Sequence, residues 1–210
     1  MNERKAQAKR ILRYLKKRYS DAKIALRYKT PMQLFVAVVL SAQCTDKKVN
    51  EVTATLFKKY KTADDFARAN KKVFEQEIRS TGFYRAKAKN IIAAARAIRD
   101  KFKGKIPKKM EQILQIPGIG RKSANVILGN AYGVVEGVAV DTHVKRFANV
   151  CELSSHHDPV KIEQDLMKLF PRSEWFLLTY RIIEHGRRSR TKEHKHEKCF
   201  LRDFCGDPKF

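Results

Sequence analysis

The chain has 210 residues, enough for one large domain or two small ones with a stable hydrophobic core. Its 46 lysines and arginines against 22 aspartates and glutamates give a net charge of +24, which excludes a basic partner and is typical of proteins that bind polyanions. With 43% hydrophobic and 10% aromatic residues, the composition is too apolar for a disordered chain.

No sequence signal indicates a membrane or an export pathway. The longest strongly apolar run, residues 34–40, is far shorter than the roughly 18 to 20 residues that span a bilayer. The charged first residues are not followed by the apolar stretch of a secretion signal. Four scattered cysteines are too few for a disulfide framework, which favours reduced thiols. We therefore expect a cytoplasmic protein with no membrane partner.

Helix signals recur along the chain and period-two alternation is nearly absent, which predicts an all-α protein of about ten helices. The first clear signal is Thr30-Pro31, followed by Gln33 in position for a capping box, and it predicts a helix through Ser41. Thr45 is placed to cap the next helix.

Further helices are expected later in the chain. An apolar stripe at spacings of three and four begins at Ile91, and the helix that carries it is expected to end at Gly104. Asp158 and Pro159 predict the start of a helix, and Ser173 predicts the start of another that stops at Gly186.

The segment from Leu114 to Asn125 ends one helix and starts another through Pro-Gly-Ile-Gly. Gly118 and Gly120 permit positive φ and leave no Cβ between the backbone and a ligand, so successive N–H groups can face a phosphate at the start of the next helix. Taken alone, the same pattern also fits a plain turn between two helices.

Lys122 is the residue of this segment that indicates chemistry. The first turn of a helix is unfavourable for a lysine charge, and the neighbouring Arg121 adds repulsion, so both favour the neutral, nucleophilic amine. Such an amine can form a Schiff base with a sugar or carbonyl carbon. The alternative is a lysine that only contacts phosphate.

Five motifs in order resemble the endonuclease III family of DNA glycosylases. They are residues 40–46 (LSAQCTD), 81–84 (TGFY), the hairpin with Lys122, 140–144 (VDTHV) and 184–188 (EHGRR). Because the motifs are separated and span nearly the whole chain, accidental agreement is improbable.

The resemblance implies catalytic roles for Lys122 and Asp141. Lys122 would attack C1′ of a damaged nucleotide, the base would leave, and the imine would permit β-elimination of the 3′ phosphate. Asp141 would stabilise positive charge on the sugar and accept a proton. Without the resemblance, Asp141 is better interpreted as the N-cap of a helix over residues 142–150, and it can serve both purposes.

The resemblance also implies DNA-binding residues. Gln43 and Phe83 would fill the gap that a flipped-out nucleotide leaves in the duplex. The alternatives for these two are a helix C-terminal amide and a core aromatic. The remaining residues assigned to DNA binding are Gly118, Gly120, Arg121 and His143.

The family fold implies two helical lobes with the active site in the cleft between them. A six-helix barrel, with its helix-hairpin-helix motif at about 110–125, would occupy residues 23–135. Residues 1–22 and 136–210 would form the second lobe.

The sequence departs from many family members at the C-terminus. Those members bind a four-iron, four-sulfur cluster with four cysteines, and here only Cys199 and Cys205 match the last pair. We therefore predict no iron–sulfur cluster and no metal site. Zinc bound by Cys199, Cys205, His194 and His196 is an alternative, although the spacing fits no common zinc motif.

The predicted function is a bifunctional base excision repair enzyme, a DNA glycosylase for oxidised pyrimidines with AP lyase activity. Its partner would be double-stranded DNA with damaged bases or abasic sites, and it would act as a monomer, associated with the nucleoid if its source is bacterial or archaeal. Two alternatives stay open. One is a monofunctional glycosylase for mismatched or altered bases that uses water activated by Asp141, and the other is a non-catalytic helix-hairpin-helix protein that binds DNA.

Overall fold

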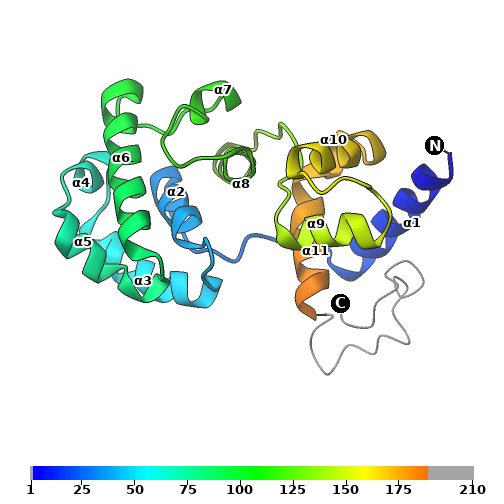
Figure 1. The fold of residues 1–210 in the computed structure, drawn as a ribbon, viewed down its shortest axis with the longest axis horizontal. Coiled ribbons are helices and arrows are strands. Elements are labelled where there is room, and N and C mark those ends of the chain that lie inside the picture. The colour runs from blue at the N-terminus through cyan, green and yellow to red at the C-terminus, as the bar shows by residue number, and fades with distance from the viewer. Residues whose placement is uncertain (1, 189–210) are drawn as a thin grey trace. The chain divides into compact units, whose positions relative to one another are not determined.

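The computed structural model describes residues 2–188, which contain helices and no strand (Figure 1). The all-α prediction is therefore confirmed for this part of the chain. The chain divides into two compact units. We call residues 25–134 the central unit, and residues 2–24 with 135–188 the terminal unit. None of the helices in residues 2–188 is long and apolar enough to cross a membrane.

The central unit contains seven α-helices and one short 3-10 helix. They are α2 (Pro31–Leu40), α3 (Asp46–Lys59), α4 (Ala63–Ala67), α5 (Lys71–Glu77), η1 (Arg79–Thr81), α6 (Tyr84–Phe102), α7 (Met110–Ile113) and α8 (Arg121–Tyr132).

Helix α2 lies in the middle of the central unit and is buried on nearly all sides. It packs against α3, α6 and α8, and eight of its ten residues are buried. Thr30 caps its first turn, with its hydroxyl accepting a hydrogen bond from the Gln33 N–H at 3.2 Å. The Gln33 side chain accepts from the N–H of Lys29, one residue before the position that a capping box requires. The helix ends at Leu40, one residue before the expected end.

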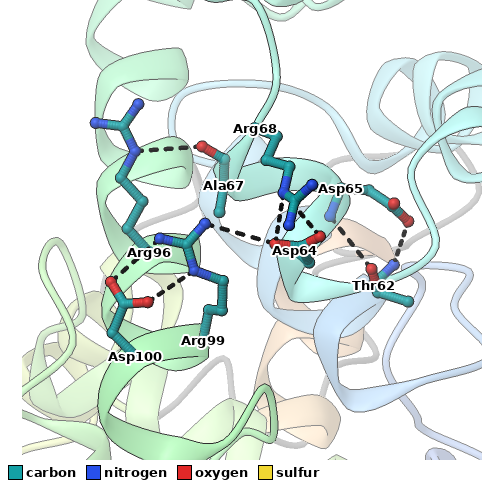
Figure 2. Close-up of polar contacts among 8 residues, drawn as sticks. All are labelled: Thr62, Asp64, Asp65, Ala67, Arg68, Arg96, Arg99 and Asp100. Carbon is teal, nitrogen blue, oxygen red and sulfur yellow. Dashed lines mark hydrogen bonds and ion pairs between the residues drawn. The ribbon is translucent and has the colours of Figure 1, made fainter.

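A group of charged side chains joins α4 to α6 (Figure 2). Asp64 of α4 forms ion pairs with Arg68, the C-cap of that helix, at 3.0 Å and with Arg99 of α6 at 3.5 Å. The Arg99 guanidinium also pairs with Asp100 at 2.7 Å. Arg96 adds a hydrogen bond from its Nε to the Ala67 carbonyl oxygen at 3.2 Å. These contacts hold the short helix α4 along the side of α6.

The terminal unit is built from segments at both ends of the described chain. Its helices are α1 (Asn2–Arg18), α9 (Thr142–Val150), α10 (Pro159–Leu169), η2 (Arg172–Glu174) and α11 (Trp175–Arg188). One apolar core holds them together, and its fully buried members include Ile11, Leu15, Phe147, Leu166 and Leu178. A polar contact supports this core, since Glu174 pairs with Arg181 at 2.6 Å and with Lys16 at 2.5 Å.

The structure corrects the expectation that Gly186 ends a helix. Helix α11 continues through this residue to Arg188. A Cβ added at Gly186 would lie 2.8 Å from the Nδ1 of His143, which is closer than side chains can approach. The glycine therefore serves the close packing of α11 on the His143 ring rather than a helix end.

One more helix end and one helix start also differ from expectation. The α6 helix stops at Phe102, and Lys103 is the first residue in the left-handed conformation, with φ of 53°, before Gly104. Ser173 lies in η2, and α11 begins two residues later at Trp175.

Candidate active site

The helix-hairpin-helix segment is formed by α7, a tight turn and α8 in the central unit. Ile113, Ile116 and Ile119 are buried and fix the turn to the unit's core. Gly118 has a φ of +81°, a conformation that favours glycine, and a Cβ there would contact the side chain of Asn90 in α6 at 3.4 Å. Both the backbone angle and the neighbouring helix therefore require a residue without a large side chain at position 118.

The first turn of α8 presents backbone donors and a lysine. Gly120 is the N-cap, with an extended backbone and no side chain to bond the following N–H groups. The first N–H groups of a helix have no intrahelical partner, and a helix N-terminus of this kind suits an anion. The Lys122 side chain is exposed, and Arg121 is half-buried.

Asp141 begins α9 in the terminal unit. Its Oδ1 accepts a hydrogen bond from the Val144 N–H at 2.9 Å, so the carboxylate caps the helix. The interpretation of Asp141 as an N-cap is confirmed. This bond uses one carboxylate oxygen, and the residue is only half-buried. Within residues 2–188, the second oxygen has no hydrogen bond, so it can take a further role.

Gln43 and Phe83 share an unusual backbone conformation in the central unit. Gln43 lies in the turn after α2 with a φ of 50°, and Phe83 is the N-cap of α6 with a φ of 48°. Both are in the left-handed region that non-glycine residues avoid. Both side chains are exposed, and Phe83 is 65% exposed although it is a large apolar residue. Neither is therefore a core residue.

Lys87 was missed by sequence reasoning. Its side chain is only 4% exposed, and its ammonium donates hydrogen bonds to the Leu40 carbonyl at 2.8 Å and the Thr81 carbonyl at 2.7 Å. Desolvation by burial lowers the pKa of Lys87 below its ordinary value. The available signal was its position four residues before Ile91, which places a lysine on the apolar stripe of α6.

His143 lies in the first turn of α9 and is half-buried, with its ring against Gly186 of α11. This position accounts for the glycine, and a role for the ring in DNA binding stays a prediction.

Two of the four cysteines lie in the described part of the chain. Cys151 is fully buried in the apolar core of the terminal unit, and Cys44 belongs to the central unit. Cys199 and Cys205, with His194 and His196, lie outside the described residues. Such clusters ordinarily need four thiolates, and two of the chain's four cysteines belong to separate helical units. Within residues 2–188, no group of three or more acidic, histidine or cysteine side chains could hold a metal ion.

Comparison with known proteins defines the class. Residues 36–172 match the family model of HhH-GPD superfamily base excision DNA repair proteins. Endonuclease III of Synechocystis sp. is 49% identical over 187 residues, 89% of this chain and 85% of the relative. Endonuclease III of Bacillus subtilis is 40% identical over 170 residues, 80% of this chain and 77% of the relative.

A solved structure agrees with these relatives. A trapped endonuclease III–DNA covalent intermediate superimposes with a TM-score of 0.91 at 38% identity, covering 98% of this chain and 97% of that one. The chain belongs to the endonuclease III family, as the five motifs predicted. It is a base excision repair DNA glycosylase, in a family known for AP lyase activity.

Proposed function

We propose that Lys122 is the nucleophile of a bifunctional reaction on oxidised pyrimidines in double-stranded DNA. Its amine attacks C1′ of the damaged nucleotide, the glycosidic bond breaks, and the base leaves with a proton. The C1′–O4′ bond then breaks and O4′ takes the remaining proton of the amine nitrogen, which completes an imine with the opened sugar. Removal of a C2′ proton then expels the 3′ phosphate by β-elimination.

One observation carries this proposal: an exposed lysine in the first turn of α8, directly after the hairpin, in a chain of the endonuclease III family. The hairpin supports it, because a glycine turn that leads into a helix N-terminus suits a DNA phosphate next to that amine. A similar endonuclease III has been trapped as a covalent intermediate with DNA, which is the state that an imine would give on reduction.

The other predicted residues have supporting roles in this proposal. Asp141 stabilises positive charge on the sugar and accepts the proton with the oxygen that the α9 cap leaves free. Gln43 and Phe83 enter the duplex and occupy the place of the flipped nucleotide, for which their exposure is required. Arg121 and His143 contact the DNA backbone.

Borohydride trapping tests the nucleophile. Reduction should give a covalent adduct between the protein and an abasic duplex, and Lys122→Ala should abolish it. Lys101→Ala, which removes an exposed charge from the end of α6, is the matched control and should keep the adduct. An adduct that persists in Lys122→Ala would refute the assignment. Base release by the wild type without any adduct would instead indicate water activated by Asp141.

We also propose that the protein works as a monomer. We propose further that it holds no iron–sulfur cluster, because such clusters ordinarily need four thiolates and Cys151 is fully buried in the apolar core of the terminal unit. Stoichiometric iron and acid-labile sulfide, or zinc, in the purified protein would refute the absence of a metal. A panel of duplexes that each contain one lesion tests the preference for oxidised pyrimidines.

A further inference from the structure

A buried charged group is hydrogen-bonded to the two segments that precede Gln43 and Phe83, the exposed residues proposed to enter DNA. The Lys87 ammonium is 4% exposed and donates to the carbonyl oxygens of Leu40 and Thr81 at 2.8 and 2.7 Å. An ammonium is costly to remove from water unless charge-assisted hydrogen bonds replace its solvation. These two bonds therefore have to be strong for the lysine to stay in this place.

The two carbonyls belong to two different segments of the central unit. Leu40 is the last residue of α2, where carbonyl groups lack an intrahelical partner and a positive charge is favoured by the helix dipole. Thr81 is the last residue of η1, and its own hydroxyl is fixed by a hydrogen bond to the Ile78 carbonyl at 2.8 Å. One ammonium thus joins the end of α2 to the end of η1.

Leu40 and Thr81 are each followed within three positions by an exposed residue with a strained backbone. Gln43 follows Leu40 by three residues and has a φ of 50°, and Phe83 follows Thr81 by two residues and has a φ of 48°. A left-handed conformation at a non-glycine residue persists only where the surrounding structure imposes it. The two carbonyls that Lys87 holds are fixed points close in sequence to both strained residues.

We infer that Lys87 is a positioning residue, which fixes the turn with Gln43 and the turn with Phe83 relative to each other so that both side chains enter the duplex together. The inference rests on the proposed function of those two side chains. Turns that were free to move would have to be ordered when DNA binds, whereas turns held in advance avoid that cost.

A lysine-to-methionine pair on α6 tests the inference. Lys87→Met removes both hydrogen bonds at similar side-chain length, and Lys89→Met removes the same charge from an exposed position of the same helix. Relative to Lys89→Met, Lys87→Met should lower the single-turnover rate on a duplex lesion about 10- to 100-fold. Borohydride trapping on a single-stranded abasic oligonucleotide needs no insertion into a duplex. The yield of the covalent adduct should therefore differ less than about twofold between the variants.

Fluorescence gives a second readout that general stability would not change. A 2-aminopurine opposite the lesion should brighten when the wild type or Lys89→Met binds, because its neighbours unstack. With Lys87→Met at saturating protein, most of this increase should be absent. An undiminished increase would contradict the inference.

The effect of Lys87 should depend on the two side chains that it positions. In a background with Gln43→Ala and Phe83→Ala, Lys87→Met should change the duplex rate less than about twofold. If Lys87→Met still lowers the duplex rate by the full amount in that background, Lys87 only supports the unit's core. That result would overturn the inference and leave the role of Gln43 and Phe83 intact. If Gln43→Ala and Phe83→Ala act on duplex DNA at the wild-type rate, the two side chains have no insertion role. The inference, which rests on that role, would then also be overturned.

If Lys87→Met is unfolded by circular dichroism, Lys87→Gln provides the test, because its amide is shorter and uncharged but still polar. The same loss on duplex DNA is expected, and an unchanged rate would contradict the inference.

Discussion

Asp141 combines a structural and a chemical task in one carboxylate. One oxygen accepts a hydrogen bond from the Val144 N–H in the first turn of α9, which fixes the side chain at the start of the helix. The other oxygen has no hydrogen bond to any of the residues that the structure describes. A carboxylate fixed in this way does not have to be ordered when the substrate arrives. The cap explains why a residue proposed for catalysis is also a strong local signal in the sequence.

Substitutions at position 141 separate the two tasks. Asp141→Asn keeps a good N-cap but removes the charge, so we expect the free energy of unfolding to change little while single-turnover base excision falls about 10²- to 10⁴-fold. Asp141→Ala should lose similar activity and also about 1 kcal/mol of stability, measured by urea unfolding. Near wild-type excision by Asp141→Asn would show that the carboxylate only caps the helix.

The sequence indicated residues whose contacts lie nearby in the chain or that belong to a family motif. Lys122 and Asp141 lie at helix starts that capping and turn rules describe, and the structure has both helices at the expected residues. Lys87 was not found because its partners are 47 and six residues away and the first contact forms only in the folded unit. The site roles themselves stay predictions until they are measured.

At the scale of elements, helix starts were predicted better than helix ends. Thr45 and Asp158 cap their helices as expected, because an N-cap is a contact between a side chain and a backbone N–H two or three residues away. The predicted helix end at Gly186 was wrong because that glycine makes room for the His143 ring on another helix. Local rules hold where the partner is local.

The short helix α4 has a complete capping box that the sequence analysis did not use. The Asp65 carboxylate accepts a hydrogen bond from the Thr62 N–H at 2.8 Å, and the Thr62 hydroxyl accepts one from the Asp65 N–H at 3.2 Å (Figure 2). The Asp65 carboxylate also accepts a hydrogen bond from the Lys61 N–H at 2.9 Å. The two backbone N–H groups hold the pKa of Asp65 below its usual value of 3.8.

This lowered pKa gives a pH-dependent contribution to stability. The contribution is fully present above the unfolded value of 3.8 and is lost as the pH falls through the lower folded value. Asp65→Asn should therefore reduce the free energy of unfolding by up to about 1 kcal/mol at neutral pH, with the difference shrinking below 3.8. Urea unfolding across that range measures it. A difference for Asp65→Asn that stays constant across this range would contradict the role of its charge.

At the scale of the whole molecule, the charge of +24 is the property that composition alone established. It indicates a polyanionic partner but neither the reaction nor the base, because phosphate contacts carry no base sequence. The five motifs predicted the reaction, and the family match confirmed the class of base excision DNA repair proteins. Helical content followed from capping and periodicity, whereas the close approach of His143 to Gly186 depends on packing that no motif encodes.

The same charge predicts a steep salt dependence of DNA binding. Each phosphate neutralised by a lysine or arginine releases counterions, so six to ten contacts would give a slope of log K against log salt of roughly −5 to −9. Fluorescence anisotropy with an undamaged duplex between about 50 and 200 mM salt should then show an affinity loss of about 10³- to 10⁵-fold. Arg121→Ala should make the slope shallower by about one, because one phosphate contact is removed. Phe83→Ala removes an exposed apolar ring and no charge, so it should leave the slope unchanged whatever it does to affinity. A nearly flat slope for the wild type would mean that the excess positive charge does not face DNA.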